Sequence, residues 1–314
     1  MSYQLRNKMT ETAENEGIFF SPYRISTITC NADIGNNINL DLSVLFANIG
    51  VIENEGDLQG IIWAQYLKDD NEINKGVYPK KRRKSKKNIL KKNRFDNQIT
   101  IIFRINEHYM PNVKIFKNGN IQLTGIKNQQ DTELIVNYII DQITDIYSSN
   151  RNIIIDYQEG YNLVMKYQNF KIRMINTDFK IYCDENFQEQ FEIKRKEIHK
   201  LFISDRYKNK CSFQPGIYQG VKLEFFWNVN DEIKDGICKC PNHCYGKGNG
   251  QTIGNCKKVT GALFESGSVL ITGGITFDQV ADTYKYICRF LKDNKNLIKK
   301  PRLNIANANI THDN

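Results

Sequence analysis

Hydrophobic and polar residues alternate over many short stretches of the chain, and over longer stretches apolar residues recur every three or four positions. Alternation predicts strands with one buried face, as at residues 99–105 (ITIIFRI) and 216–227 (GIYQGVKLEFFW). The longer spacing predicts two amphipathic helices, with apolar stripes formed by Ile135, Ile139, Ile143 and Ile146 in one and by Phe277, Val280, Tyr284, Ile287 and Leu291 in the other. This mixture of elements predicts an α+β fold.

One sequence pattern occurs twice, 148 residues apart. Residues 115–126 (IFKNGNIQLTGI) match residues 263–274 (LFESGSVLITGG), with the identical pairs Phe116/Phe264, Gly119/Gly267, Thr124/Thr272 and Gly125/Gly273. The register continues without a gap into the predicted helices, through Tyr138/Tyr286 and Ile139/Ile287. We interpret this pattern as an internal duplication.

Each copy has the same predicted order of elements. Asn118-Gly119 and Ser266-Gly267 supply a tight hairpin turn, and Asp131 and Thr276 lie where a helix N-cap or first turn is expected. Each copy also has an opening strand and helix, predicted at residues 23–32 and 40–49 in the first and at 162–175 and 187–202 in the second. Helices on one face of such a sheet leave its other face free as a candidate binding surface.

The positive charge of the chain is concentrated in one segment. The net charge is +9, and residues 80–92 (KKRRKSKKNILKK) hold nine basic residues and no acid, so the rest of the chain sums to zero. Such a run is a nuclear-localisation signal, a phosphate-binding arm or a solvated loop. A polar start and the lack of 18 consecutive apolar residues lead us to expect an intracellular protein with no membrane association.

Four of the eight cysteines lie close together in a glycine-rich segment. Cys238, Cys240, Cys244 and Cys256, with His243 beside them, have the spacing C-x-C-x3-C-x11-C, which is not a common zinc-finger pattern. Four thiolates can bind zinc tetrahedrally and so order a loop with little apolar content. The alternative is a set of reduced thiols without a metal.

Both copies of the repeat resemble the TATA-binding protein family, whose core is a tandem repeat carrying phrases of the type IFxSGKxVxTGAK. Residues 213–218 (FQPGIY) are similar to the family's FPGLIY, and residues 25–42 to its opening strand and helix. The resemblance implies a saddle, a curved antiparallel sheet with helices on its convex face, and a divergent member of the kind found in large DNA viruses. It divides the chain into a flexible N-terminus (1–21), a first repeat (22–150, with a basic insertion at 52–94), a second repeat (151–292, with a cysteine-rich insertion at 228–258) and a tail (293–314).

The same resemblance implies a transcription initiation factor that binds and bends AT-rich promoter DNA through the minor groove. In the family, phenylalanines wedge into base steps, and discrimination comes largely from how easily a sequence deforms. The implied partners are double-stranded DNA and the transcription machinery, in the nucleus, a viral factory or a virion. The implied DNA-binding residues are the wedges Phe95, Phe116, Phe213 and Phe264, the groove contacts Gln122, Thr124, Leu270 and Thr272, and the phosphate contacts Arg104, Lys127 and Lys222.

The sequence departs from the family at several of its binding positions. The family's paired asparagines fall near Tyr23 and Arg173 or Met174, and lysines are replaced by Asn120, Ser268 and Ile275. These changes are expected to weaken DNA binding and shift its sequence preference. Lys208 and Lys210 stand where the family has an acidic patch for an initiation factor, so the usual partner is also in question.

Two other functions compete with DNA bending. The repeat unit also serves as an accessory domain of nucleic-acid enzymes, but the four histidines (His108, His199, His243 and His312) are scattered, and no P-loop or HExxH motif is present. We therefore expect a non-enzymatic protein. The second alternative is a saddle-shaped interaction platform with weak or no DNA binding, in which Phe116 and Phe264 are ordinary strand residues.

Overall fold

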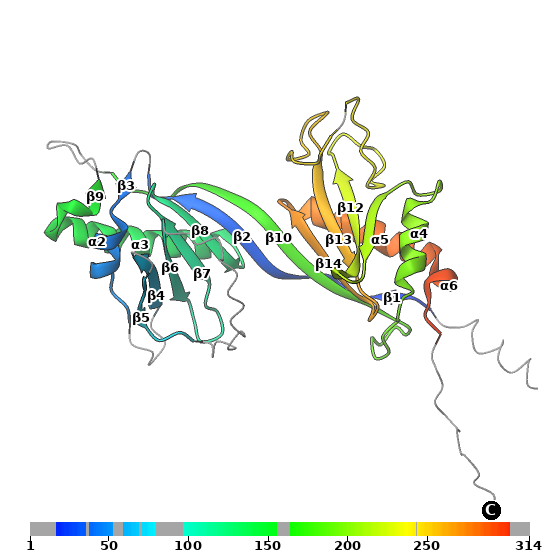
Figure 1. The fold of residues 1–314 in the computed structure, drawn as a ribbon, viewed down its shortest axis with the longest axis horizontal. Helices are drawn as coiled ribbons and strands as arrows, with labels where there is room; N and C mark the ends of the chain where they lie inside the picture. The colour runs from blue at the N-terminus through cyan, green and yellow to red at the C-terminus, as the bar shows by residue number, and fades with distance from the viewer. Residues whose placement is uncertain are drawn as a thin grey trace, which may run out of the picture. The chain divides into compact units, whose positions relative to one another are not determined.

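A computed structural model describes residues 17–35, 38–52, 59–68, 71–79, 97–155, 164–242 and 244–301. The chain folds as two compact units (Figure 1): the first unit is Ile25–Ile175, and the second unit joins Met1–Arg24 to Asn176–Asn314. The division falls inside two long strands, β2 (Arg24–Asp33) and β10 (Gln168–Tyr182). The division in β10, between Ile175 and Asn176, lies after the predicted repeat boundary at residue 150, because Met165, Tyr167 and Phe170 pack against the core of the first unit.

The strands of the first unit form an antiparallel sheet in the order β2-β8-β7-β6-β4-β5. Its other strands are β4 (Gly60–Lys68), β5 (Asn71–Gly76), β6 (Gln98–Arg104), β7 (Asn112–Phe116) and β8 (Asn120–Ile126). A short pair, β3 (Asn39–Leu40) and β9 (Ile154–Ile155), lies beside α2 (Leu42–Asn48), α3 (Gln129–Ser149) and the 3-10 turn η1 (Arg151–Ile153). The β4–β5 hairpin comes from the predicted insertion at 52–94 and provides the edge of the sheet.

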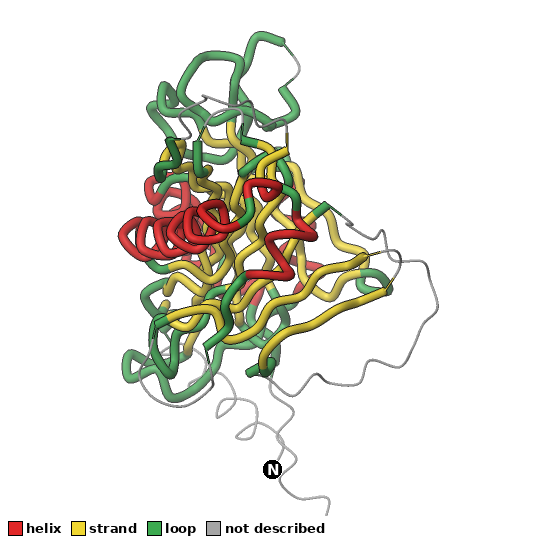
Figure 2. The backbone as a smooth tube through the Cα atoms, turned by 90° about the vertical axis from the view of Figure 1, so that its left-hand side faces the viewer, coloured by secondary structure: helices red, strands yellow, loops and turns green. Residues whose placement is uncertain are grey.

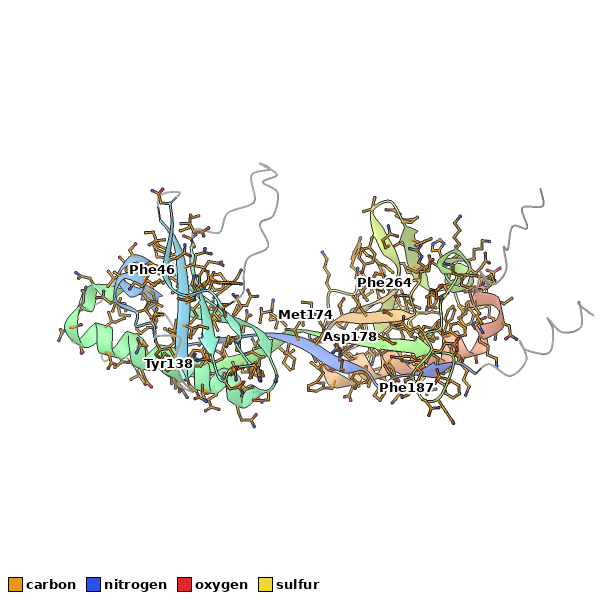
Figure 3. All side chains as sticks on the ribbon, turned by 90° about the horizontal axis from the view of Figure 1, so that it is seen from below. Phe46, Tyr138, Met174, Asp178, Phe187 and Phe264 are labelled. Carbon is orange, nitrogen blue, oxygen red and sulfur yellow. The ribbon has the colours of Figure 1, made fainter. Side chains whose placement is uncertain are left out.

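One face of this sheet is covered by the two helices. Alternate strand residues such as Ile101, Val113 and Leu123 are fully buried with residues of α2 and α3, among them Phe46 and, at the margin of the core, Tyr138 (both labelled in Figure 3). A smaller cluster of Ile62, Trp63 and Ile102 lies apart from this core. Ile102 alternates with the core residues of β6, so this cluster buries the β4–β6 part of the opposite face.

The second unit repeats the arrangement with the strand order β11-β12-β13-β14-β10 and β1 paired to β10. Its strands are β1 (Phe19–Phe20), β11 (Lys210–Gln214), β12 (Tyr218–Trp227), β13 (Lys257–Leu263) and β14 (Ser268–Gly274), and its helices are α4 (Arg195–Ile203), α5 (Phe277–Asp293) and α6 (Lys295–Ile298). The core joins helices and sheet through aromatic contacts: Phe225 of β12 lies 5.3 Å from Tyr286 of α5, and Phe202 of α4 stacks on Phe290 of α5. The predicted α+β class, an antiparallel sheet with helices packed on one face, is confirmed.

The internal duplication is visible in the backbone itself. Lys114 faces Gln122 and Asn112 faces Thr124 in the first unit, and the corresponding residues of the second unit pair as Ala262 with Leu270 and Thr260 with Thr272. Both hairpins turn through a glycine in the left-handed region, Gly119 (φ +75°) and Gly267 (φ +77°), and each glycine N–H donates to the phenylalanine carbonyl three residues earlier at 3.0 Å. The hairpin prediction is therefore confirmed in register as well as in type.

The two long helices also begin at equivalent positions. Asn128 caps α3 by accepting from the Asp131 N–H, and Thr276 caps α5 within a reciprocal capping box with Gln279. Thr276 is thus the predicted cap, and Asp131 is the predicted first-turn residue. Over the described parts of the chain, no helix is both long enough and apolar enough to cross a membrane.

Candidate nucleic-acid interface and metal centre

The face of each sheet that turns away from its helices is here called the open face. In the first unit, Phe116, Gln122 and Thr124 alternate with the buried residues Ile115, Ile121 and Leu123. Strand alternation therefore places all three on the open face, together with Asn112 and Lys114. The structure brings together these three predicted contacts of the first repeat.

Asn31 joins this group from β2, opposite Gln122. Its carbonyl oxygen is buried and has no hydrogen-bond partner among the described residues. Two residues along, Asp33 lies opposite Asn120 and accepts a hydrogen bond from Asn169 at 2.8 Å. Sequence analysis missed Asn31, although its alternation with the buried Cys30 and Ala32 was a signal that it faces the open side. It provides an amide on the open face from β2, the first strand in this unit's sheet order, whereas Tyr23, near which the family pattern places an asparagine, precedes β2 and packs against Tyr284 of α5.

The open face of the second unit is more apolar at its centre. Leu270 and Thr272 lie opposite Ala262 and Thr260, and Phe264 (labelled in Figure 3) follows directly after β13. Val269 and Ile271 alternate with them and are fully buried. Three of the predicted contacts of this repeat, Phe264, Leu270 and Thr272, therefore share one face, and all three are half-buried.

Charged groups on this face partly neutralise one another. The Glu224 carboxylate lies 3.1 Å from the Lys210 Nζ and 3.4 Å from the Lys258 Nζ. Lys222 is exposed, with its Nζ 4.1 Å from the centre of the Tyr218 ring, and Lys127 of the first unit lies 4.4 Å from the Tyr109 ring. These two lysines are available for phosphates, whereas Lys210 and Lys258 share a carboxylate.

Two of the predicted contacts that the structure describes, Arg104 and Phe213, are not on an exposed open face. Arg104 is only 4% exposed at the end of β6, so its guanidinium cannot neutralise a phosphate without leaving its site. Phe213 packs against α4, with its ring 6.4 Å from the His199 ring and 5.4 Å from the Arg195 guanidinium. Phe95 and the basic run at residues 80–92 lie outside the described residues.

The four predicted cysteines converge in the loop between β12 and β13, which extends beyond the ends of these strands (Figures 1 and 2). The four sulfur atoms all lie within 4.8 Å of one another, and the Sγ atoms of Cys240 and Cys256 are 3.3 Å apart. A tetrahedral zinc with Zn–S bonds of about 2.3 Å places its sulfurs about 3.8 Å apart, so the cluster has the size of such a site. His243 lies outside the described residues.

The electrostatics of the cluster suit a metal better than free thiols. Burial raises the pKa of the Cys256 thiol, as do its cysteine neighbours. At Cys244, burial opposes ionisation, but hydrogen bonds that include one from the Gly246 N–H lower the thiol pKa. A cation at the centre of the cluster would stabilise all four thiolates together. The Asn228 amide, 3.9 Å from the Cys256 sulfur, and the Gly246 N–H supply further hydrogen bonds to sulfur.

The chain was compared with known proteins. No protein-family model matches it. A TATA-box-binding protein-like protein of Acanthamoeba polyphaga mimivirus is 27% identical over 282 residues, covering 85% of this chain. The chain spans 64% of the length of that relative. The solved structure of Methanococcus jannaschii TBP matches 88% of this chain and 99% of its own, with 16% identity and a TM-score of 0.41. By its sequence, the chain is a divergent relative of the TATA-box-binding protein-like protein of a giant virus.

Proposed function

We propose that this protein is a transcription initiation factor that binds and bends AT-rich DNA by laying its two open faces on the minor groove. The observation that carries the proposal is the duplicated surface: Phe116 with Thr124 and Phe264 with Thr272 occupy equivalent positions in equivalent hairpins. A duplex is itself close to two-fold symmetric, so a duplicated protein surface suits both of its halves. The sequence relationship to a TATA-box-binding protein-like protein supports the same proposal.

The chemistry of the open faces suits the minor groove. This groove presents mainly acceptors, adenine N3 and thymine O2, and the guanine amino group is the feature that distinguishes G·C pairs. The amides of Asn31 and Gln122 and the hydroxyls of Thr124 and Thr272 can donate to those acceptors. A guanine amino group would meet the apolar Leu270 and Ala262, so G·C pairs are disfavoured there.

Fluorescence anisotropy with AT-rich and GC-rich duplexes tests this proposal, at two salt concentrations. The wild-type protein is expected to bind the AT-rich duplex at least tenfold more tightly, and F116A/F264A to lose at least tenfold in affinity for it. F277A is the matched control, because Phe277 is an exposed phenylalanine at the start of α5, away from the open face. Equal binding of both duplexes, or equal losses in F277A and F116A/F264A, would contradict the proposal.

A protein-interaction platform is the second candidate function, and Glu224 favours it. This carboxylate lies on the open face, where it would repel phosphates if its lysine partners moved away. A folded protein that binds neither duplex in the anisotropy experiment would favour the platform instead. The E224Q variant refines the test, since a DNA-binding face should gain affinity when this charge is removed.

We further propose that Cys238, Cys240, Cys244 and Cys256 bind a structural zinc ion. The ion would hold the loop between β12 and β13 in its fold, since the loop exposes Ile233, Tyr245 and Ile253 and buries few apolar residues of its own. Elemental analysis should find one zinc per chain in the wild type and in C288S, whose thiol belongs to α5, and none in C240S/C244S. Folded wild-type protein purified without zinc would contradict the assignment.

A further inference from the structure

Two aromatic rings form a pair at one corner of the second open face. The Tyr218 and Phe264 rings lie 5.7 Å apart between centroids and at 61° to one another. Tyr218 shares its strand face with Lys222, because both alternate with the fully buried Val221 and Leu223. Phe264 continues the face of Ala262, which is opposite Lys222. Both rings therefore lie on the side of the sheet away from the helices.

Gly220 has no side chain, and this leaves the space that the Tyr218 and Phe264 rings occupy. A Cβ atom at this position would lie 2.9 Å from Cε1 of Tyr218 and 3.1 Å from Cε1 of Phe264. Gly220 does not have a positive φ, so its backbone conformation is open to any residue. The glycine is required by space, and the two rings pack directly over the backbone of β12.

Phe213, the wedge implied by the sequence, is held away from this pair. Cys211 is opposite the fully buried Leu223, so strand alternation places Phe213, two residues later, on the helix side of the sheet, where its ring lies 6.4 Å from the His199 ring of α4. Arg195 lies over that ring. The Arg195 guanidinium is fixed in turn by the Glu265 carboxylate at 2.5 Å and the Gln219 carbonyl at 2.6 Å. Phe213 would have to break these contacts to reach a base step.

We propose that Tyr218, and not Phe213, is the partner of Phe264 in the aromatic wedge that this unit inserts into a DNA base step. This inference rests on the proposed function, DNA bending, and it assigns the wedge residues of the second unit. The Tyr218 and Phe264 rings supply the apolar surface that replaces base stacking. Lys222, 4.1 Å from the centre of the Tyr218 ring, places a positive charge beside the wedge, where the phosphates flanking an opened step would lie.

The test measures DNA bending by energy transfer between dyes at the two ends of an AT-rich duplex, and base unstacking by 2-aminopurine fluorescence. Y218A and F264A are each expected to lose tenfold or more in affinity, together with most of the bend and the 2-aminopurine signal. F213A is expected to stay within twofold of the wild type in all three measurements. Y218F keeps the ring and should behave as the wild type, which separates the ring from the hydroxyl.

Folding is controlled by Y218T, which keeps a residue suited to a strand at this position of β12 but has neither a ring nor a large apolar surface. It should fold as the wild type by circular dichroism and thermal unfolding, and still lose the 2-aminopurine signal. Loss of bending in F213A with full bending in Y218T would overturn the proposal and leave DNA bending by this protein intact. Absence of binding and bending in the wild type would instead overturn the proposed function together with this inference.

Discussion

At the scale of single residues, the second open face depends on a position that has no side chain. Gly220 is buried beneath Tyr218 and Phe264, and its neighbours on β12 are fixed by pairing with β13. Gly216, a few residues earlier in the turn before β12, has open space around the position of a Cβ atom. The two glycines therefore have different roles, although they lie in the same hairpin.

Substitution of these glycines by alanine separates the two roles. G220A is expected to lower the free energy of unfolding by about 1–3 kcal/mol, because the new methyl group overpacks both rings. G216A should be neutral or stabilising by up to about 1 kcal/mol, since it only restricts the unfolded chain. Urea unfolding followed by circular dichroism measures both. Equal stability of the two variants would show that the rings do not pack over Gly220.

The reactivity of Cys211 depends on pH in a direction that its site determines. Burial raises the pKa of its thiol to about 12, so the reactive thiolate is scarce below that pH. In the unfolded chain the thiol titrates near its usual pKa of about 8.5. Alkylation of native Cys211, followed by mass spectrometry, should therefore be far slower than in urea at pH 8 and should accelerate about tenfold per pH unit. Equal labelling rates in the native and urea-unfolded protein at pH 8 would show that the thiol is not buried.

At the scale of elements, the repeat consists of a hairpin followed by a capped helix, and each copy places its phenylalanine in the same way. Gly125 (φ +92°) and Gly273 (φ +91°), each one residue before the end of the second strand of its hairpin, have a left-handed conformation, and the helix begins a few residues later. The connection between hairpin and helix is short, and the N-cap residue within it fixes the residue at which the helix begins. The orientation of the open face is therefore coupled to the packing of the helix behind it.

Removal of the two N-caps tests this equivalence. N128A and T276A are each expected to cost about 1 kcal/mol, because each exposes N–H groups at the start of a long helix. T276A should cost no more than N128A, because it removes only the acceptor of the Gln279 N–H, while the backbone N–H of residue 276 still donates to the Gln279 Oε1. Thermal unfolding of both variants beside the wild type gives the comparison. No change in either variant would contradict the capping geometry.

Local chemistry explains which elements could be predicted from the sequence. The hairpin turns, the strand faces and the starts of the two long helices follow from short patterns such as Asn118-Gly119 and Thr276, and these predictions were confirmed. The helix predicted at 187–202 is shorter than expected, because α4 begins only at Arg195. The orientation of Phe213 could not be predicted, because it depends on the pairing of β11 with β12 and on Arg195 from another element. The burial of Arg104 is likewise a tertiary effect, since a strand-end arginine is ordinarily solvated. Asn31 could not be predicted from the resemblance, because the family pattern places its asparagine near Tyr23, before the start of β2.

At the scale of the whole molecule, two units of similar construction carry different open faces. The first is the more polar, with Asn31, Gln122 and Lys114 in neighbouring strands, and the second has Ala262 and Leu270 at its centre. The two insertions also differ: one continues from the β4–β5 hairpin into the basic run, and the other contains the cysteine cluster. If the proposed function holds, this asymmetry would let the protein bind DNA in one orientation, since identical halves could not distinguish the two directions.

The basic run should dominate the salt dependence of DNA binding. If residues 80–92 neutralise about seven phosphates, their deletion should lower the slope of log K against log salt by about six. The loss of affinity should be the same for AT-rich and GC-rich duplexes, because phosphate contacts carry no sequence information. Anisotropy titrations at four salt concentrations give the slope. An unchanged slope would assign the run to another role, such as nuclear import.

Replacement of A·T pairs by inosine·cytosine pairs is the most direct test of binding through the minor groove. An inosine·cytosine pair keeps the minor-groove pattern of A·T, because inosine lacks the guanine amino group, while its major groove resembles that of G·C. We predict that the wild-type protein binds the substituted duplex within about threefold of the AT-rich duplex and still rejects the G·C duplex. Affinity that falls to the G·C level on this replacement would contradict minor-groove recognition.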